Sequence, residues 1–352
     1  MTRPLMTVLV TAHRRRQYIR RALDSVRAQT IDRSEYEVVV VSNFEGRYEG
    51  LSNLKWITVD EEGLSPKIAL GFEEARGEVV SILEDDDQWL PDKLRFVRDL
   101  MMREHIDFLH NNMIRTYDDA ILMPSEQADL KACSFSVKIG PGFDTVNLRL
   151  FRRVWPCIWN NSSMSVRRDF MLSDQELLRF LKVGDVTSGV DLLLALYSID
   201  YGTVLHVHNP LTLYNLHNFF EAPYHKPEWM LAHIARVSRE HLKVLRFLSN
   251  KCKTSRCKRF ANMLELVTYP YFMLINSKGL LNLRLRNELM RYLGERLPAY
   301  LLLLFYSPRI FANKTLWSLM PLTLTLKLLP SKYQRRAPLP STRETYSHIY
   351  RS

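Results

Sequence analysis

The chain has 352 residues, of which 46% are hydrophobic and 25% are charged. This ordinary composition excludes a disordered or fibrous protein, and the length predicts one large domain with an appendage. The net charge of +11 is unevenly distributed: residues 225–352 carry 23 Lys and Arg against 6 Asp and Glu, whereas residues 1–224 carry 26 against 32. A basic C-terminal third indicates either a polyanion or anionic membrane as neighbour, or a solvated basic surface.

The four cysteines, at positions 133, 157, 252 and 257, have spacings that predict neither a disulfide framework nor a zinc site. An apolar run begins at Leu5, which leaves no room for a signal peptide. We therefore expect the N-terminal domain to lie in the cytosol.

Strand-like and helix-like segments alternate over the first hundred residues. Apolar, Val-rich runs of strand length occur at Leu5–Ala12, Glu37–Ser42, Leu54–Val59 and Glu78–Leu83. Helical spacing is found in Arg15–Gln29, and further helices are expected from Ser65-Pro66 to Gly77 and from Pro91 onward. This β-α-β-α-β order predicts an α/β protein with an open, doubly wound sheet, whose ligands bind at the carboxyl ends of the strands.

The C-terminal part differs in character. A basic helical segment is expected at 226–259, a membrane domain of about three short apolar helices at 260–332, and a basic tail at 333–352, after a catalytic domain at 1–225. The apolar runs are Phe260–Asn276, Leu297–Ala312 and Thr315–Pro330. Because a bilayer span takes about 20 apolar residues, these runs fit membrane spans, interfacial helices or a small helical domain.

Four consecutive acids, Glu84-Asp85-Asp86-Asp87, stand at the end of a predicted core strand. Their mutual repulsion is unfavourable unless a cation cancels it. Carboxylate oxygens suit Mn²⁺ or Mg²⁺, and these ions in turn hold a diphosphate. A solvated acidic turn is the alternative.

Several segments resemble family 2 inverting glycosyltransferases. The run Leu83–Leu94 resembles their Asp-X-Asp region, and Thr11–Arg15 stands where the family has Pro-Thr-Tyr-Asn-Arg. Ala22–Thr30 is similar to the family's first helix. The segments Gly63–Ser65, Ala75–Glu78, Asn161–Arg168, Gly189–Gly202 and Asn209–His217 match further blocks in order. The resemblance covers about residues 5–220.

The resemblance implies a glycosyltransferase-A fold, which is a Rossmann-like, doubly wound mixed sheet. It implies Asp191 as the general base, and Asp85, Asp87 and His217 at a Mn²⁺ or Mg²⁺ site, with Asp86 as an alternative by one residue. The nucleotide-sugar site would contain Thr11, Ala12, His13, Arg15, Ser42, Asn43, Ser65, Lys67, Asp85 and Asp86.

Some positions depart from the family pattern. Ser42-Asn43 replaces an Asp that often reads the base, which blurs the preference between GDP and UDP. Val190 replaces the Glu of Gly-Glu-Asp, and Lys67 is expected to supply a positive charge that an absent Arg would have given.

A basic, apolar C-terminus after such a domain resembles dolichyl-phosphate mannose synthases, cellulose-synthase-like enzymes and archaeal N-glycan mannosyltransferases. This resemblance implies a membrane enzyme whose catalytic domain faces the cytoplasm, with membrane lipid as a partner. It would move mannose from GDP-mannose to dolichyl phosphate or another lipid-linked acceptor. The alternatives are a soluble or peripheral transferase that uses a UDP-sugar on a non-lipid glycan, and a nucleic-acid- or nucleotide-binding protein without activity. Nucleic acid is not the expected partner, because the aromatic residues of the basic part lie within apolar runs.

Overall fold

A computed structural model describes residues 3–117, 120–121, 133–154, 157–158, 160–184, 186–216, 227–262 and 264–265. The chain divides into two compact units, and the second begins at Asn218. The first unit contains every strand given below.

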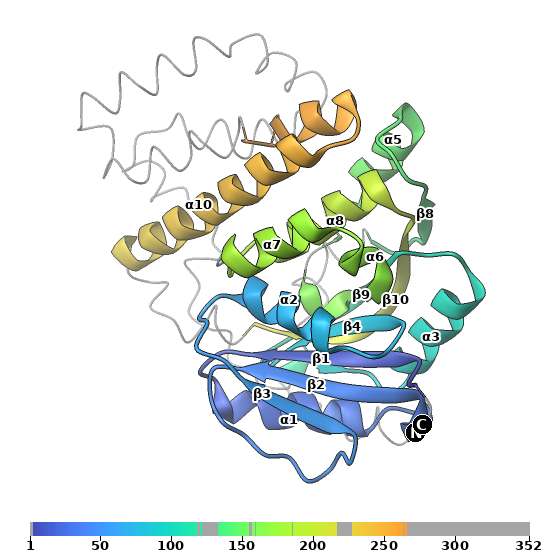
Figure 1. The fold of residues 1–352 in the computed structure, drawn as a ribbon, viewed down its shortest axis with the longest axis vertical. Coiled ribbons are helices and arrows are strands. Elements are labelled where there is room, and N and C mark those ends of the chain that lie inside the picture. The colour runs from blue at the N-terminus through green and yellow to red at the C-terminus, as the bar shows by residue number, and fades with distance from the viewer. Residues whose placement is uncertain are drawn as a thin grey trace. The chain divides into compact units, whose positions relative to one another are not determined.

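A mixed sheet forms the centre of the first unit (Figure 1). Its strand order is β3-β2-β1-β4-β9-β6-β10-β5, with β7 paired to β6 and β8 paired to β10. The strands are β1 Met6–Ala12, β2 Tyr36–Ser42, β3 Leu54–Thr58, β4 Val79–Glu84, β5 Gln88–Trp89, β6 Phe108–Tyr117, β7 Ala120–Ile121, β8 Val137–Ile139, β9 Met164–Arg167 and β10 Val204–Asn215. The predicted α/β class and mixed sheet are confirmed.

Strands β1 to β4 run parallel, as predicted, and β9 is inserted antiparallel between β4 and β6. Strand β10 is parallel to β6. Since parallel strands end at one edge of the sheet, the carboxyl ends of β1, β2, β4 and β10 lie on the same side. The segments that follow these strands are therefore brought together.

Helices cover both faces of the sheet (Figure 1). Alternate residues of β1 point to opposite faces: Val8 and Val10 pack in one core with α1, whereas Leu9 meets α2. The approach of α2 is close, because a Cβ on Gly71 would lie 2.2 Å from Leu9 Cδ1. The longer helices of the unit are α1 Arg16–Arg27, α2 Leu64–Glu74, α3 Lys93–Arg103, α5 Thr145–Val154, α7 Gln175–Gly184 and α8 Val190–Tyr201. Short helical segments are η1 Arg33–Glu35, η2 Asn161–Ser163 and α6 Arg168–Leu172.

The start of α2 differs from the prediction. The helix begins at Leu64 after the N-cap Gly63, one residue before the expected start, and the Ser65 hydroxyl accepts a hydrogen bond from the Val186 backbone N at 2.9 Å. The backbone N of Ser65 donates to the Val186 oxygen at 2.8 Å. Ser65 thus joins α2 to the segment that precedes α8.

The second unit contains α10, Pro227–Lys251. Among the described residues, no helix combines the length and the apolar character that a bilayer crossing needs. The predicted apolar helices from 260 to 332 lie outside the described residues except for the first few positions, and the predicted tail at 333–352 lies wholly outside them.

The prediction that the cysteines form no disulfides is wrong. Cys133 pairs with Cys157, and Cys252 pairs with Cys257, with Cα atoms 5.7 and 5.6 Å apart. The first pair joins segments on either side of β8 and α5, and only the tertiary fold brings these segments together.

Candidate active site

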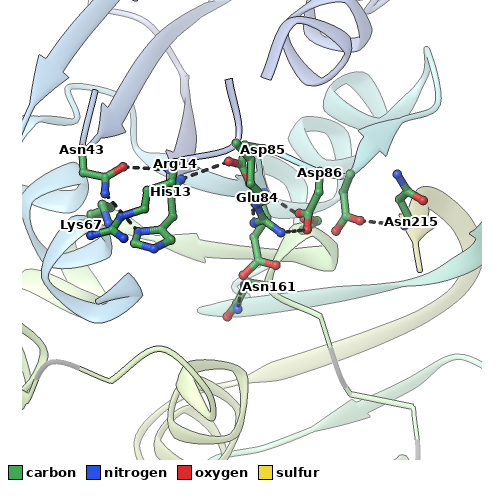
Figure 2. A network of polar contacts seen from close by, with 12 residues as sticks. His13, Arg14, Asn43, Lys67, Glu84, Asp85, Asp86, Asn161 and Asn215 are labelled. Atoms are coloured by element: carbon green, nitrogen blue, oxygen red, sulfur yellow. Dashed lines mark hydrogen bonds and ion pairs between the residues drawn. The ribbon is translucent and has the colours of Figure 1, made fainter. Parts of the chain in front are cut away.

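Glu84 ends β4, and the three aspartates that follow it form a turn before the short strand β5. Figure 2 shows Glu84, Asp85 and Asp86 of this group. Carboxylate oxygens of Glu84, Asp86 and Asp87 lie within 4.8 Å of one another. Asp85 points to the other side, where its two oxygens accept hydrogen bonds from the backbone N of His13 at 3.0 Å and from Arg15 at 2.5 Å. Three acids therefore converge, and the fourth fastens the turn to the loop after β1.

The electrostatics of this turn are strained. Burial, with repulsion from Asp86, raises the pKa of Glu84 to about 8. Burial also raises the pKa of Asp85 to about 7, although Arg15 opposes the shift. The pKa of Asp87 is raised well above its ordinary value by burial, then by Asp86 and Glu84. Each shift means that the native fold disfavours the charged carboxylates as they stand.

The converging carboxylates fit a divalent cation. Asp87 is 1% exposed, and its Oδ1 accepts a hydrogen bond from the Asn215 backbone N at 2.9 Å. Its Oδ2 is buried and has no hydrogen-bond partner among the described residues. A buried acceptor without a donor, beside two further carboxylates, is the hard-oxygen environment that Mn²⁺ or Mg²⁺ prefers. The set in the structure is Glu84, Asp86 and Asp87, whereas the sequence indicated Asp85, Asp87 and His217.

Arg15 is the cation that faces this turn from the loop after β1. Its guanidinium contacts both Asp85 and Asp86, and these two carboxylates raise its own pKa against the opposing effect of burial. Since Asp85 is fully buried, Arg15 compensates part of the acidic charge. The predicted donor-site residue Arg15 is thus brought to the acids.

The loop after β1 also contacts the end of β2 (Figure 2). Asn43 accepts a hydrogen bond from the Arg14 backbone N at 2.9 Å, and its Nδ2 lies 3.3 Å from His13 Nδ1. His13 Nε2 lies 3.3 Å from a carboxylate oxygen of Glu62. Burial and then Lys67 lower the pKa of His13. His13 and Asn43, both predicted to bind the donor, are therefore neighbours, and Glu62 joins them.

Other predicted donor-site residues form hydrogen bonds within the chain or are buried in this structure. The Ser42 hydroxyl donates to the Phe44 carbonyl oxygen, and Ser65 is held by Val186 as described above. Lys67 is 1% exposed and donates to the carbonyl oxygens of Glu62 and Gly63. Thr11 and Ala12 are buried at the end of β1. His217 lies outside the described residues.

Asp191 lies in the first turn of α8, after Gly189 in the left-handed region with φ 92°. Its Oδ1 accepts a hydrogen bond from the Leu192 backbone N at 2.8 Å, and its Oδ2 accepts a long one from the Asn160 backbone N at 3.4 Å. Burial raises the pKa of Asp191. A carboxylate with a raised pKa is a stronger base, as proton abstraction requires.

The segment Asn160–Ser163, called here the bridging turn, connects Asp191 to the acids. Asn161 Nδ2 donates to Glu84 Oε1 at 2.9 Å, and the Ser162 hydroxyl accepts a hydrogen bond from the Glu84 backbone N at 2.9 Å. Asn160 at the other end contacts Asp191. The base and the metal candidates, more than a hundred residues apart in sequence, are therefore joined by adjacent residues of one turn.

The sequence did not single out the residues that hold the bridging turn. Fully buried Lys93 donates to the Ser162 carbonyl oxygen at 2.6 Å and to Thr212 Oγ1 at 3.2 Å, and its amine lies 4.5 Å from the centre of the Trp89 ring. The indole of Trp89 donates to the same carbonyl oxygen at 2.8 Å. The only sequence signal for Lys93 was its place just after the acids, within the quoted run Leu83–Leu94.

The model of the family Glycosyl transferase family 2 matches residues 7–155. This part of the chain is therefore similar to a family 2 glycosyl transferase domain. The match contains the four acids and Arg15, whereas the bridging turn, Asp191 and Asn215 follow it in the chain. The sequence-based recognition of the family is confirmed.

Individual similar proteins are distant from this chain. An uncharacterized glycosyltransferase of Nostoc sp. is 27% identical over an alignment of 132 residues, with coverage of 33% of this chain and only 40% of that relative. Among solved structures, TarS 1-349 of S. aureus in complex with UDP is 15% identical with a TM-score of 0.47, covering 84% of this chain and 88% of that one. The mannosyltransferase PcManGT of Pyrobaculum calidifontis, in complex with GDP-Man and Mn²⁺, is 15% identical with a TM-score of 0.47, covering 93% and 86%.

Proposed function

We propose that this chain is an inverting, metal-dependent glycosyltransferase that transfers a hexose from a nucleotide sugar to an acceptor hydroxyl or phosphate oxygen. The observation that carries the proposal is the pairing of two acidic centres through the bridging turn. Glu84, Asp86 and Asp87 converge at one end of this turn, and the partly buried Asp191 lies at the other. Inversion needs a leaving diphosphate and a base on opposite faces of the sugar, and two separate acidic centres meet this need.

In this mechanism Asp191 accepts the proton of the acceptor oxygen as that oxygen attacks the anomeric carbon. The new bond forms to the acceptor, the bond to the diphosphate oxygen breaks, and the nucleoside diphosphate leaves with the electron pair. Burial prepares Asp191 by raising its pKa, and the backbone N atoms of Leu192 and Asn160 fix its two oxygens. Proton removal of this type typically contributes about 10²–10⁴-fold in rate.

A divalent ion held by Glu84, Asp86 and Asp87 would supply positive charge to the departing diphosphate. Asn161 orients Glu84, and the Asn215 backbone orients Asp87. Arg15 keeps Asp85 and Asp86 in place from the loop after β1.

The test is a panel of GDP- and UDP-sugars with Mn²⁺, Mg²⁺ or EDTA, scored for donor hydrolysis and for transfer. We expect turnover with at least one donor in Mn²⁺ and its loss in EDTA. Asp191→Asn should bind the donor with unchanged affinity and lose at least 100-fold in transfer rate. Wild-type transfer rates in Asp191→Asn would remove that residue from the mechanism, and equal donor binding in Mn²⁺ and EDTA would remove the metal.

We further propose GDP-mannose as the donor and a lipid-linked acceptor such as dolichyl phosphate, as in N-glycan assembly, with the enzyme attached to a membrane and the catalytic domain facing the cytoplasm. Support comes from the resemblance and from α10. The side chains of Arg236, Arg239, Lys243 and Arg246 are exposed, and no other residue described between 236 and 249 is. Their spacing of three, four and three residues places them on one face of the helix.

Each Lys or Arg of a basic helix face contributes about 1 kcal/mol of binding free energy near an anionic membrane surface. Full-length protein should sediment with phosphatidylserine vesicles and not with neutral phosphatidylcholine vesicles, and Arg239→Glu with Lys243→Glu should weaken this binding at least tenfold. Asn250→Asp, an exposed change on the same helix, is the control. Vesicle binding that is the same with and without phosphatidylserine, and the same in the double variant as in wild type, would contradict the membrane proposal. Tighter binding to nucleic acid than to vesicles would also contradict it.

A further inference from the structure

The bridging turn contains two buried amide atoms that nothing else in the described structure satisfies. Asn160 is 9% exposed and Asn161 is 7% exposed. The Nδ2 donor of Asn160 and the Oδ1 acceptor of Asn161 have no hydrogen-bond partner among the described residues. Leaving a buried polar group unpaired is unfavourable, so such atoms point to a partner that arrives from outside.

The other half of each amide is already committed. Asn160 Oδ1 accepts a hydrogen bond from the Ser162 backbone N at 2.8 Å, and Asn161 Nδ2 donates to Glu84 at 2.9 Å (Figure 2). These bonds fix the orientation of both side chains. Asn160 Nδ2 is therefore a donor, and Asn161 Oδ1 an acceptor, whose side chains are already fixed in orientation.

Their location matches the transferred sugar. Asn160 contacts Asp191 through its backbone N, and Asn161 contacts Glu84 through its side chain. Consecutive Cα atoms are only about 3.8 Å apart, so Asn160 and Asn161 span a short interval between the base and the acids. In the proposed reaction this interval holds the sugar ring, because its anomeric carbon stands between the attacking oxygen and the diphosphate.

The backbone of Asn160 supports a role for this residue in binding. Its φ of 74° lies in the region that residues other than glycine seldom adopt. Asn tolerates this conformation better than most residues, but it still costs free energy, and such strain is concentrated at binding and catalytic sites.

We propose that Asn160 and Asn161 form a hydroxyl-binding subsite for the transferred sugar, in which Asn160 Nδ2 donates to a sugar oxygen and Asn161 Oδ1 accepts from a sugar hydroxyl. A hydroxyl group both donates and accepts, so it matches the two atoms. This proposal rests on the proposed transferase function. It assigns Asn160 and Asn161 to binding of the sugar rather than of the nucleotide. The two atoms are covered in the ligand-free chain, so the sugar enters with a local shift of side chains.

The test compares binding of a nucleoside diphosphate with binding of its sugar conjugate, by calorimetry with Mn²⁺. The probes are GDP with GDP-mannose and UDP with UDP-N-acetylglucosamine. Asn160→Asp keeps the acceptor that Ser162 uses and replaces the donor by a carboxylate oxygen, which also adds a negative charge. The substitution should weaken binding of the nucleotide sugar at least tenfold, which is about 1.4 kcal/mol. The affinity for the nucleoside diphosphate should stay within twofold of wild type. Asn53→Asp is the matched control, because it makes the same amide-to-carboxylate change just before edge strand β3, where the Asn53 amide donates to the backbone oxygens of Arg33 and Tyr36.

Asn160→Gly is a second variant, because glycine accepts the positive φ and keeps the backbone N that contacts Asp191. It should show the same selective loss. Equal weakening of diphosphate and nucleotide sugar, or no weakening of either, overturns the subsite. So does a wild type that binds both probes equally, since the sugar then makes no contact. A wild type that binds no diphosphate in Mn²⁺ overturns the transferase proposal itself and the subsite with it.

Discussion

Replacing Glu84 by Gln should make the metal-free protein more stable and the metal-loaded protein less able to bind its ion. The Gln carbonyl can still accept the hydrogen bond from Asn161, while the charge that faces Asp86 is removed. The pKa of Glu84 rises from 4.5 to about 8, so its carboxylate binds a proton more tightly in the native than in the unfolded chain. The native state therefore loses stability as pH rises from about 4.5 through about 8.

One pKa unit corresponds to about 1.4 kcal/mol, so the full rise amounts to at most about 5 kcal/mol at alkaline pH. Because Asp86 and Asp87 share the same repulsion, we expect Glu84→Gln to gain about 2–4 kcal/mol over wild type at pH 8 in EDTA. At pH 4.5 the two proteins should be nearly equally stable, since Glu84 is then protonated in the native state and about half protonated in the unfolded state.

Urea unfolding at pH 4.5 and pH 8, in EDTA and in Mn²⁺, measures these differences. At a Mn²⁺ concentration of 100 times the Kd of wild type, the free energy of unfolding of wild type should rise by about 2.7 kcal/mol. The rise for Glu84→Gln should be much smaller. The exposed Glu45→Gln is the control and should stay within about 0.5 kcal/mol of wild type. The reasoning is refuted if Glu84→Gln is no more stable than wild type in EDTA at pH 8.

Three further changes test neighbouring parts of the structure. Arg15→Met removes the guanidinium partner of fully buried Asp85 and should cost about 3–5 kcal/mol in EDTA at pH 8, and clearly less at pH 5; equal losses by urea unfolding at both values would contradict the pairing. Gly77→Ala places a Cβ 2.4 Å from the backbone carbon of Met6 and should cost about 1–3 kcal/mol in thermal unfolding, whereas Gly140→Ala, with its nearest atom at 3.9 Å, should cost far less. Mn²⁺ affinity should rise from pH 6 to pH 8 with release of protons, because Glu84 must lose its proton to bind; a pH-independent Kd by calorimetry would exclude Glu84 as a ligand.

Local patterns in the sequence were enough to predict the first half of the sheet. The buried face of α1, with Tyr18, Ile19, Ala22, Leu23 and Val26, agrees with the predicted helical spacing. The parallel strands β1 to β4 also agree with their Val-rich runs to within two residues. These elements follow from periodicity over short windows, which a single sequence carries.

The arrangement of the acids could not be predicted in the same way. Along a strand, neighbouring side chains alternate between faces, but Asp85 and Asp86 lie in a turn where this rule fails. The resemblance indicated Asp85 as a ligand. In the structure Asp85 contacts Arg15 instead, and the carboxylate oxygens of Glu84, Asp86 and Asp87 lie together.

Long-range partners were also beyond local patterns. Asn161 and Asn215 contact the acids from 77 and 128 positions later in the chain, and Asn160 contacts Asp191 across 31 positions. Nothing in the immediate sequence of these asparagines predicts such contacts. The cysteine pairing was misjudged for the same reason, since disulfides depend on where the fold places the two Cα atoms.

The hydrogen bond from the Asn215 backbone to Asp87 has a consequence for synthesis of the protein. A ribosome releases all four acids long before it releases β10, and chains are made at only about 5–20 residues per second. For many seconds the nascent chain therefore contains its acids without Asn161, Asp191 or the last residues of β10. The hydrogen bond to Asp87 cannot form until residue 215 has emerged, so the proposed ion site would be completed only late in translation of the domain.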